Sequence, residues 1–321
     1  MNNFTHISPT SISDATAALT QYGSAATVIS GGTDLIAEFV VRTHSTPFQY
    51  VIDLKKITPS MEYITADSTG LKIGALTKLD DIVNSSAVQT GYSVLSQAAS
   101  KVASWPIRNM GTIGGNICQG VRCWYYRSSA EWFDCLRKNP KGTCFALTGD
   151  NRYQHSIFGA TNGCFAANVS DIAPALIALG ASIKTSSQTI TAEKFFDGFK
   201  NTVLGVGEIV TEIQVPVQPT GSKQVFAKAS IRKAVDFALA SCAIVIAPAT
   251  GTVTSARIAM GGVATTPRRA TAAETALIGS AISSSLADTV ATAAVSGATA
   301  LTYNKYKIQV AKGIVKRALL T

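Results

Sequence analysis

The apolar positions near the N-terminus predict a helix, a strand, a tight turn and a second helix. Apolar residues 17–19 follow Ser13, a suitable N-cap, and predict the first helix. The β-branched residues 27–29 predict a short strand that leads into the sequence SGGT at 30–33. A second helix that begins at Asp34 would place four apolar residues on one face, namely Leu35, Ile36, Phe39 and Val40.

The pattern in the rest of the chain predicts two domains. Strands are predicted at 51–54, 71–73, 209–215, 226–230, 243–247 and 257–260. Helices are predicted at 79–103, 170–176, 270–278, 286–298 and 306–320. The linker-like sequence PVQPTGSK at 216–223 separates a predicted N-terminal domain, 1–218, from a predicted C-terminal domain, 222–321.

Residues 118–164 differ from both domains, because they combine weak periodicity with many loop-forming residues. We interpret them as an insertion into the N-terminal domain. Five of the six cysteines lie in this insertion, at positions 118, 123, 135, 144 and 164. It also holds six basic residues against three acidic ones, which favours an anionic group nearby. Without a secretory signal, clustered cysteines favour metal or redox chemistry over a disulfide framework.

Composition limits the class of protein. A chain of 321 residues with 46% hydrophobic and 15% charged residues predicts folded domains rather than disorder. The longest apolar run, 237–249, has 13 residues, fewer than the roughly 20 that a membrane span needs, so no membrane span is expected. The N-terminus lacks the basic and apolar parts of a secretory signal. We therefore expect a cytoplasmic protein, or a periplasmic one if a partner carries the export signal.

The net charge of +9 raises nucleic acid as a partner. However, the Lys and Arg residues form no run of five, and no zinc-finger, RNP-like or helix-turn-helix motif accompanies them. We therefore expect no nucleic-acid partner.

Two glycine turns are the candidate ligand-binding elements. Glycine lets backbone N–H groups approach a phosphate, because no Cβ blocks the way. Neither the turn at 31–33 nor the turn at 114–116 fits the GxGxxG or the GxxxxGK(S/T) pattern, so the usual nucleotide folds are not supported. Each turn has a hydroxyl residue beside it, Thr33 or Thr112. The pair predicts a ligand with two phosphates held from both sides, and ordinary hairpin or cap glycines remain the alternative.

Four motifs in this order resemble the FAD-binding medium subunit of the molybdenum hydroxylase, or xanthine dehydrogenase, family. They are SGGTDL at 30–35, TIGGN at 112–116, SDIAPAL at 170–176 and GGVATTPRRA at 261–270. The resemblance runs over nearly the whole chain and implies an α+β fold. In this fold a p-cresol methylhydroxylase-type FAD-binding domain of two α/β subdomains precedes a smaller α+β domain of the CO dehydrogenase flavoprotein type.

The resemblance also implies which residues contact FAD. They are the first turn and its flanks, the second turn, and four further positions. In full they are Val28, Ile29, Ser30, Gly31, Gly32, Thr33, Asp34, Leu35, Val102, Thr112, Ile113, Gly114, Gly115, Asn116, Asp171, Val210 and Lys228. No catalytic residue is expected on this chain.

The cysteine spacing C-x11-C-x8-C-x19-C fits neither a zinc ribbon nor a ferredoxin. The residues alone leave tetrahedral zinc, a structural role and an iron–sulfur cluster open. The family resemblance is nearest to 4-hydroxybenzoyl-CoA reductase and periplasmic-type aldehyde oxidoreductases, and it implies a [4Fe-4S] cluster in this insertion. Its ligands would be Cys123, Cys135, Cys144 and Cys164, with Cys118 as a free buried thiol.

The expected function is electron transfer within a heteromeric oxidoreductase. The resemblance implies a large molybdopterin-binding subunit, a small subunit with two [2Fe-2S] clusters, and an external carrier such as ferredoxin or a quinone-linked acceptor. Two other functions remain open. One is a self-sufficient FAD-dependent oxidase of the same fold, for which the chain offers only His6, His44 and His155 as histidine bases. The other is a zinc-stapled binding module without redox function.

Overall fold

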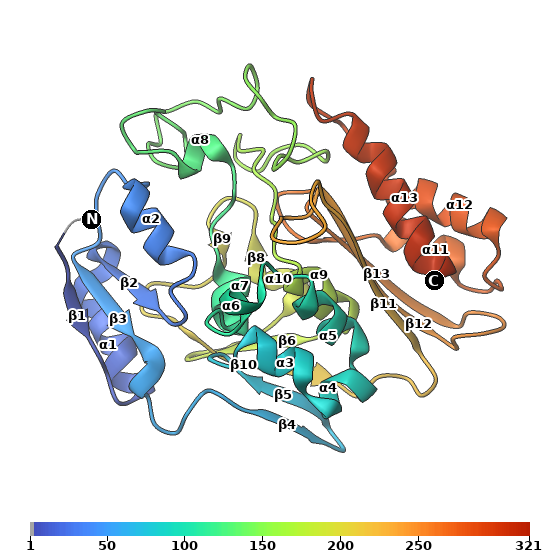
Figure 1. Cartoon of the computed structure of the whole chain (residues 1–321), viewed down its shortest axis with the longest axis horizontal. Helices are drawn as coiled ribbons and strands as arrows, with labels where there is room; N and C mark the ends of the chain where they lie inside the picture. The colour runs from blue at the N-terminus through green and yellow to red at the C-terminus, as the bar shows by residue number, and fades with distance from the viewer. Residues whose placement is uncertain (1–2) are drawn as a thin grey trace.

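The N-terminal part is a small parallel sheet covered by a helix (Figure 1). The structure, a computed structural model, describes residues 3–321, so the first two residues of the predicted N-terminal domain lie outside it. Three parallel strands lie in the order β1-β3-β2, with bounds Thr5–Ile7, Tyr50–Asp53 and Ala26–Ile29. Helix α1 (Ile12–Tyr22) buries Ala15 and Leu19 against this sheet. Its N-cap is Ser11 rather than the predicted Ser13, because the Ser11 side chain accepts a hydrogen bond from the Asp14 N–H at 3.0 Å.

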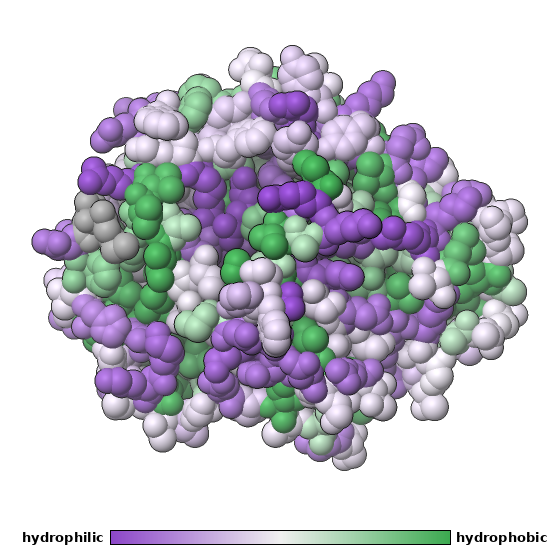
Figure 2. Space-filling model, viewed as in Figure 1, coloured by the Kyte–Doolittle hydropathy of each residue, from purple (hydrophilic) through white to green (hydrophobic). Residues whose placement is uncertain are grey.

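Helix α2 (Leu35–Val41) follows the first glycine turn, as predicted, but its apolar face is not buried. Ile36 and Val40 are 49% and 62% exposed, while Glu38 is buried. The apolar residues that share a face of α2 therefore do not pack into the core. Glu38 is turned inward by ion pairs that are described below, and Figure 2 shows hydrophobic side chains gathered over α2 on the surface.

A five-stranded antiparallel sheet forms the second part of the N-terminal domain. Its order is β4-β5-β10-β6-β7, with bounds Ile64–Asp67, Gly70–Gly74, Val210–Pro216, Ser182–Thr185 and Thr189–Thr191. The central strand β10 lies near the end of the domain in sequence but pairs with the early strand β5. The long stretch of chain between them therefore leaves the sheet and returns to it. A small hairpin, β8 (Phe196–Asp197) and β9 (Asn201–Thr202), lies just before β10.

The predicted long helix at 79–103 is broken into three helices: α3 (Leu79–Asn84), α4 (Ser86–Gly91) and α5 (Ser93–Ser100). Ser85 caps α4 by accepting a hydrogen bond from the Val88 N–H at 3.4 Å, so the chain ends one helix and starts another there. Further short helices lie in this domain, namely α6 (Trp105–Arg108), α7 (Ile113–Cys118), α8 (Trp124–Arg127), α9 (Ile172–Ala178) and α10 (Ala192–Phe195), together with 3-10 turns at Gly23–Ala25 and Leu54–Lys56.

The C-terminal domain is an antiparallel sheet with three helices on its outer face (Figure 1). Its strands are β11 (Lys223–Ala229), β12 (Ala240–Ala247), β13 (Ser255–Gly261) and β14 (Arg268–Arg269), and its helices are α11 (Thr271–Leu277), α12 (Ser284–Ala294) and α13 (Tyr306–Leu320). Every residue of β12 is buried, because α9 of the first domain covers the other face of the sheet. This explains the continuous apolar run of the sequence.

The insertion crosses one end of the molecule, from α2 to α13 (Figure 1). It has few regular elements, as predicted, and it is held at both ends by polar contacts. Within residues 3–321, no helix has the length and apolar character that a membrane crossing requires. The chain has an α+β fold with its separate cores joined around α9.

Candidate functional site

A cavity of about 550 Å³ opens between the N-terminal sheet, the five-stranded sheet and the insertion. Both glycine turns contribute to its wall, through residues 30–33 and through Thr112, Gly114 and Gly115. Other parts of the wall come from α2, from the first residues of the insertion, from residues between 201 and 210, and from residues 235–237 of the C-terminal domain. The two glycine segments that the sequence singled out thus face one space. The prediction of a turn at 114–116 was wrong, however, because Thr112 caps α7 there and both glycines lie in the first turn of that helix.

The two turns touch each other directly. The Ser30 hydroxyl lies 3.0 Å from the Thr112 hydroxyl, and the latter accepts a hydrogen bond from the Gly115 N–H at 3.1 Å as the N-cap of α7. A Cβ on Gly31 would overlap the backbone carbonyl oxygen of Met110. A Cβ on Gly115 would lie 3.1 Å from the Ser30 hydroxyl oxygen. Glycine is therefore required for this close approach.

A buried ion pair lies deeper in the cavity wall. Asp171 precedes α9, and its Oδ2 lies 2.6 Å from the ammonium of Lys228. Its other oxygen, Oδ1, is buried without a hydrogen-bond partner. Burial raises the pKa of Asp171 to about 6, although the charge of Lys228 and its hydrogen bond oppose this shift. A carboxylate oxygen is thus free for a donor group of a ligand.

Most of the predicted FAD-contacting residues line this cavity. They are Val28, Ile29, Ser30, Gly31, Gly32, Thr33, Asp34, Leu35, Val102, Thr112, Gly114, Gly115, Asn116, Asp171 and Val210. Two are not in the lining. Ile113 is fully buried in the core below α7, and Lys228 lies behind Asp171, where it also donates to the Lys101 carbonyl at 2.9 Å.

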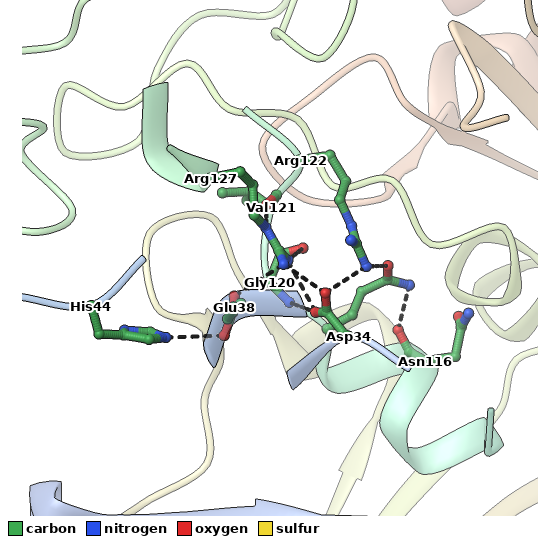
Figure 3. Close-up of polar contacts among 9 residues, drawn as sticks. Asp34, Glu38, His44, Asn116, Gly120, Val121, Arg122 and Arg127 are labelled. Atoms are coloured by element: carbon green, nitrogen blue, oxygen red, sulfur yellow. Dashed lines mark hydrogen bonds and ion pairs between the residues drawn. The ribbon is translucent and has the colours of Figure 1, made fainter. Parts of the chain in front are cut away.

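A network of charged residues joins the first glycine turn to the insertion (Figure 3). The Asp34 carboxylate accepts two hydrogen bonds from Arg127, at 2.6 and 3.0 Å, and pairs with Arg122 at 2.8 Å. Arg127 also pairs with Glu38 at 3.2 Å, and Glu38 accepts a hydrogen bond from His44 at 3.0 Å. The buried carboxylate of Glu38 and the partly buried carboxylate of Asp34 therefore face two guanidinium groups.

The charges in this network stabilise one another. Burial would raise the pKa of Asp34, but the hydrogen bond from Arg127 and the charges of Arg122 and Arg127 hold it below its usual value. Burial and the neighbouring charge of Arg127 lower the pKa of Arg122 to about 10. The network keeps α2, which follows the first turn, attached to the loop that leads to Cys123.

Several cavity residues had no signal in the sequence. Glu38, His44 and Tyr126 line the cavity, as do residues 235–237 and Asn201. Glu38 lies among apolar positions of α2, and an acidic residue in such a stretch was the one available hint of an inward charge. Nothing local marked the others, because they reach the cavity from separate parts of the chain.

The four predicted ligand cysteines surround one small cavity in the insertion. Cys123, Cys135, Cys144 and Cys164 all line it, together with His155. Cys118 is not part of this lining. It lies instead in the wall of the large cavity as a free thiol that is partly rather than fully buried, and desolvation raises its pKa to about 12.

Two polar side chains contact the sulfur atoms of this cysteine pocket. The Arg137 Nε–H donates a hydrogen bond to Cys164 Sγ at 3.1 Å, and His155 Nε2 lies 3.2 Å from Cys123 Sγ. Burial and the charge of Lys307 lower the pKa of His155 to about 4, so its ring is neutral at physiological pH. Within residues 3–321, no three His, Cys, Asp or Glu side chains lie close enough to share a single metal ion. The four cysteines therefore line a common cavity, but they do not form a preformed site for one ion.

The aromatic residues of the insertion divide into two groups. Tyr125 and Tyr126 line the cysteine pocket, and Phe133 packs edge-on against Tyr125 with ring centroids 5.1 Å apart. In contrast, Trp132 is 75% exposed and Trp124 is 43% exposed. Tyr126 lines both the cysteine pocket and the large cavity, so one ring separates the two spaces.

Comparison with known proteins agrees with this geometry. Residues 2–218 match the FAD binding domain in molybdopterin dehydrogenase, and residues 225–321 match the CO dehydrogenase flavoprotein C-terminal domain. The chain belongs to the FAD-binding medium subunits of the molybdenum hydroxylase family. It is a subunit of a heteromeric oxidoreductase and acts within that complex.

Individual relatives cover most of this flavoprotein subunit. It is 33% identical to the aldehyde oxidoreductase FAD-binding subunit PaoB of Escherichia coli K12 over 259 residues, which are 78% of each chain. It is 29% identical to the carbon monoxide dehydrogenase medium chain of Hydrogenophaga pseudoflava over 320 residues, which are 98% of this chain and 96% of the relative. The solved carbon monoxide dehydrogenase of the same organism superposes with a TM-score of 0.79 at 28% identity, over 99% of this chain and 96% of that one.

The cavity suits FAD. The first glycine turn brings backbone N–H groups to the cavity wall, where a pyrophosphate can approach them. The N–H groups of Gly114 and Gly115 instead donate to the Ala75 carbonyl and the Thr112 hydroxyl, so this second segment offers a close, Cβ-free surface. The Asp171 Oδ1 offers an acceptor for a ligand N–H or O–H. FAD supplies two-electron redox chemistry when bound. The chain's own part is to hold it between the two turns, with Gly31 and Gly115 allowing the approach.

Proposed function

We propose that this subunit carries a [4Fe-4S] cluster in addition to FAD and relays electrons between a molybdenum-bearing partner and an external carrier. The observation that supports the proposal most directly is the arrangement of Cys123, Cys135, Cys144 and Cys164 around one cavity. Tyr126 lies between that cavity and the one that suits FAD, so the two redox groups would be neighbours.

Basic side chains beside the cysteine pocket suit a negatively charged four-thiolate group. Arg137 at Cys164 and Lys138 nearby would also offset the negative charge of a four-thiolate cluster.

Metal binding would change the protonation of the proposed ligand Cys123. Burial raises the pKa of Cys123 to about 12, so its thiol stays protonated in the absence of a cation. Cluster assembly would release this proton, as metal binding by thiols generally does. Cys123, Cys135 and Cys164 are buried, which would shield a cluster from water, whereas Cys144 is partly exposed.

The complex proposed for this chain contains a large molybdopterin-binding subunit and a small subunit with two [2Fe-2S] clusters. The two [2Fe-2S] clusters need another subunit, because Cys118 and Cys242 are the two cysteines that remain here once four are used as ligands. The external carrier is proposed to be ferredoxin or a quinone-linked acceptor. The relatives named above are subunits of aldehyde oxidoreductase and carbon monoxide dehydrogenase, and the substrate of this complex would be selected by the large subunit.

The test is to measure iron, flavin and the visible spectrum in one preparation of the complex. Flavin bands with broad iron–sulfur absorption are expected, with four iron atoms in this subunit. Cys135→Ser should lose the cluster iron and keep FAD, because Cys135 lines the cysteine pocket and lies outside the FAD cavity. Cys118→Ser is the matched control and should keep both. Full iron in Cys135→Ser, or zinc in place of iron, contradicts the cluster.

The self-sufficient oxidase is the second function to be tested, because His44 does line the FAD cavity and pairs with Glu38. We expect the isolated chain to show no turnover with aldehydes, purines or aromatic thioesters, although a strong chemical reductant bleaches its chromophores. Turnover by a monodisperse lone chain contradicts the relay. The cytoplasmic location belongs to the same proposal, and cell fractionation tests it.

A further inference from the structure

Arg137 lies between the cysteine pocket and the FAD cavity and contacts a residue of each. At one end its Nε–H donates to Cys164 Sγ at 3.1 Å. At the other end its Nη1 donates to Asn201 Oδ1 at 3.1 Å, and Asn201 lines the FAD cavity. The same guanidinium group is thus bonded to both sites.

The rest of the guanidinium holds the β8–β9 hairpin in place. Its Nη2 donates to the Gly198 carbonyl at 3.0 Å, and its carbon lies 5.3 Å from the centre of the Phe199 ring. The same carbon lies 5.8 Å from the centre of the Tyr126 ring, which separates the two cavities. Every nitrogen of the group therefore has an acceptor, and aromatic rings cover it.

Arg137 fixes the hairpin at Asn201. Asn201 has a φ of 79°, a left-handed conformation that is uncommon for residues with a side chain and that asparagine adopts more readily than most. Arg137 supplies a contact to the side chain of Asn201 and to the turn at Gly198. Without it, the wall that Asn201 gives to the FAD cavity would lose its anchor.

We infer that Arg137 is a positioning residue that couples the two redox sites: its hydrogen bond to Cys164 raises the reduction potential of the cluster, while its grip on Asn201 shapes the FAD cavity. The inference rests on the proposed cluster. Reduction adds negative charge at the cysteine sulfurs, and a permanently charged donor stabilises that state. The fork geometry, rather than charge alone, is what reaches both sites.

The test uses the complete complex with Arg137→Gln, Arg137→Lys, Asn201→Ala and the control Arg152→Gln. Arg152 is a half-exposed arginine of the same insertion that pairs with Asp150 and contacts no cysteine. The readouts are the midpoint potential of the cluster, from an EPR-monitored titration, and the dissociation constant of FAD, from fluorescence quenching as FAD is added back to deflavinated protein.

Arg137→Gln should lower the equilibrium constant for reduction of the cluster about tenfold or more, which corresponds to a fall of about 59 mV in its one-electron midpoint potential. It should also weaken FAD binding about tenfold. Arg137→Lys keeps the charge but loses the fork, so it should recover most of the potential and still bind FAD weakly. Asn201→Ala should weaken FAD binding at an unchanged potential, and Arg152→Gln should change neither readout.

Three outcomes overturn the inference. The first is a potential in Arg137→Gln equal to that of wild type or of Arg152→Gln, and the second is wild-type FAD affinity in both Arg137→Lys and Asn201→Ala. The third is a wild-type complex without cluster iron, which also removes the cluster proposed above. If Arg137→Gln does not retain its cluster, the FAD affinities of Arg137→Lys and Asn201→Ala still decide the role of the hairpin.

Discussion

Gly31→Ala tests whether the FAD cavity depends on contact between the two glycine turns. A Cβ at this position would overlap the Met110 carbonyl oxygen and would lie 2.7 Å from its carbon and 3.0 Å from the Gly111 Cα. Ordinary contacts at such a position are 3.4–4 Å, and all three atoms belong to the backbone. The turns must therefore move apart by about 1 Å, as overpacked sites do.

The cost of that movement falls on FAD binding, because the ligand needs both turns in place at once. Overpacking of this kind costs about 1–3 kcal/mol, which corresponds to roughly 5- to 150-fold weaker binding. We expect the dissociation constant of FAD to rise by a factor within this range in Gly31→Ala. The purified variant should also contain less flavin per protein than the wild type. The free energy of unfolding of the FAD-free protein should change by less than the free energy of FAD binding does. Without FAD, the two segments can move apart and relieve the overlap.

The assay is titration of deflavinated protein with FAD, followed by the quenching of flavin fluorescence. Gly313→Ala is the matched control, because Gly313 lies within α13 and has no heavy atom within 4 Å of a new Cβ. Its FAD affinity should equal that of the wild type. A dissociation constant for Gly31→Ala within twofold of the wild type would refute the reasoning that the turns must touch.

Three further predictions follow from other contacts. Gly32→Val and Gly115→Val should lose FAD, because Gly32 has a φ of 71° and a side chain at position 115 would meet Ser30 and Thr112. Wild-type flavin content in both variants would mean that these glycines are only structural. Burial raises the pKa of Asp171 from 3.8 to about 6, so between these pH values the folded protein keeps a proton that the unfolded chain releases. The free energy of unfolding of the FAD-free protein, measured in urea, should therefore fall as the pH rises from about 4 to about 6. Asp171→Asn should lack this part of the pH dependence. Lys307 is fully buried and donates to three backbone carbonyls, so Lys307→Met should lower the free energy of unfolding by about 3 kcal/mol or more. As a control, the exposed Lys305→Met should change it by less than about 0.5 kcal/mol. Equal effects of the two substitutions in urea unfolding would contradict a stabilising role of the buried ammonium.

Local signals in the sequence were sufficient for the first glycine turn and for many of the elements. The turn at 30–33 precedes α2 as predicted, because a turn depends on a few adjacent residues, and the predicted bounds of α13 agree with the structure. The second glycine pair was predicted as a turn, but Thr112 caps a helix there and Gly114 and Gly115 lie inside α7. Local signals also misled: Ser11 and Ser13 are both suitable caps, and the apolar run after residue 79 did not reveal the cap at Ser85.

Only the tertiary structure decided which residues meet. No local pattern specifies that Gly31 meets the backbone at Met110, or that Arg137 meets Asn201, since an arginine fits many acceptors and a glycine many neighbours. The burial of Glu38 could not be predicted for the same reason: its partner Arg127 lies in the insertion, far along the chain. Periodicity reports how apolar a face is, but an ion pair formed across the fold determines which face turns inward.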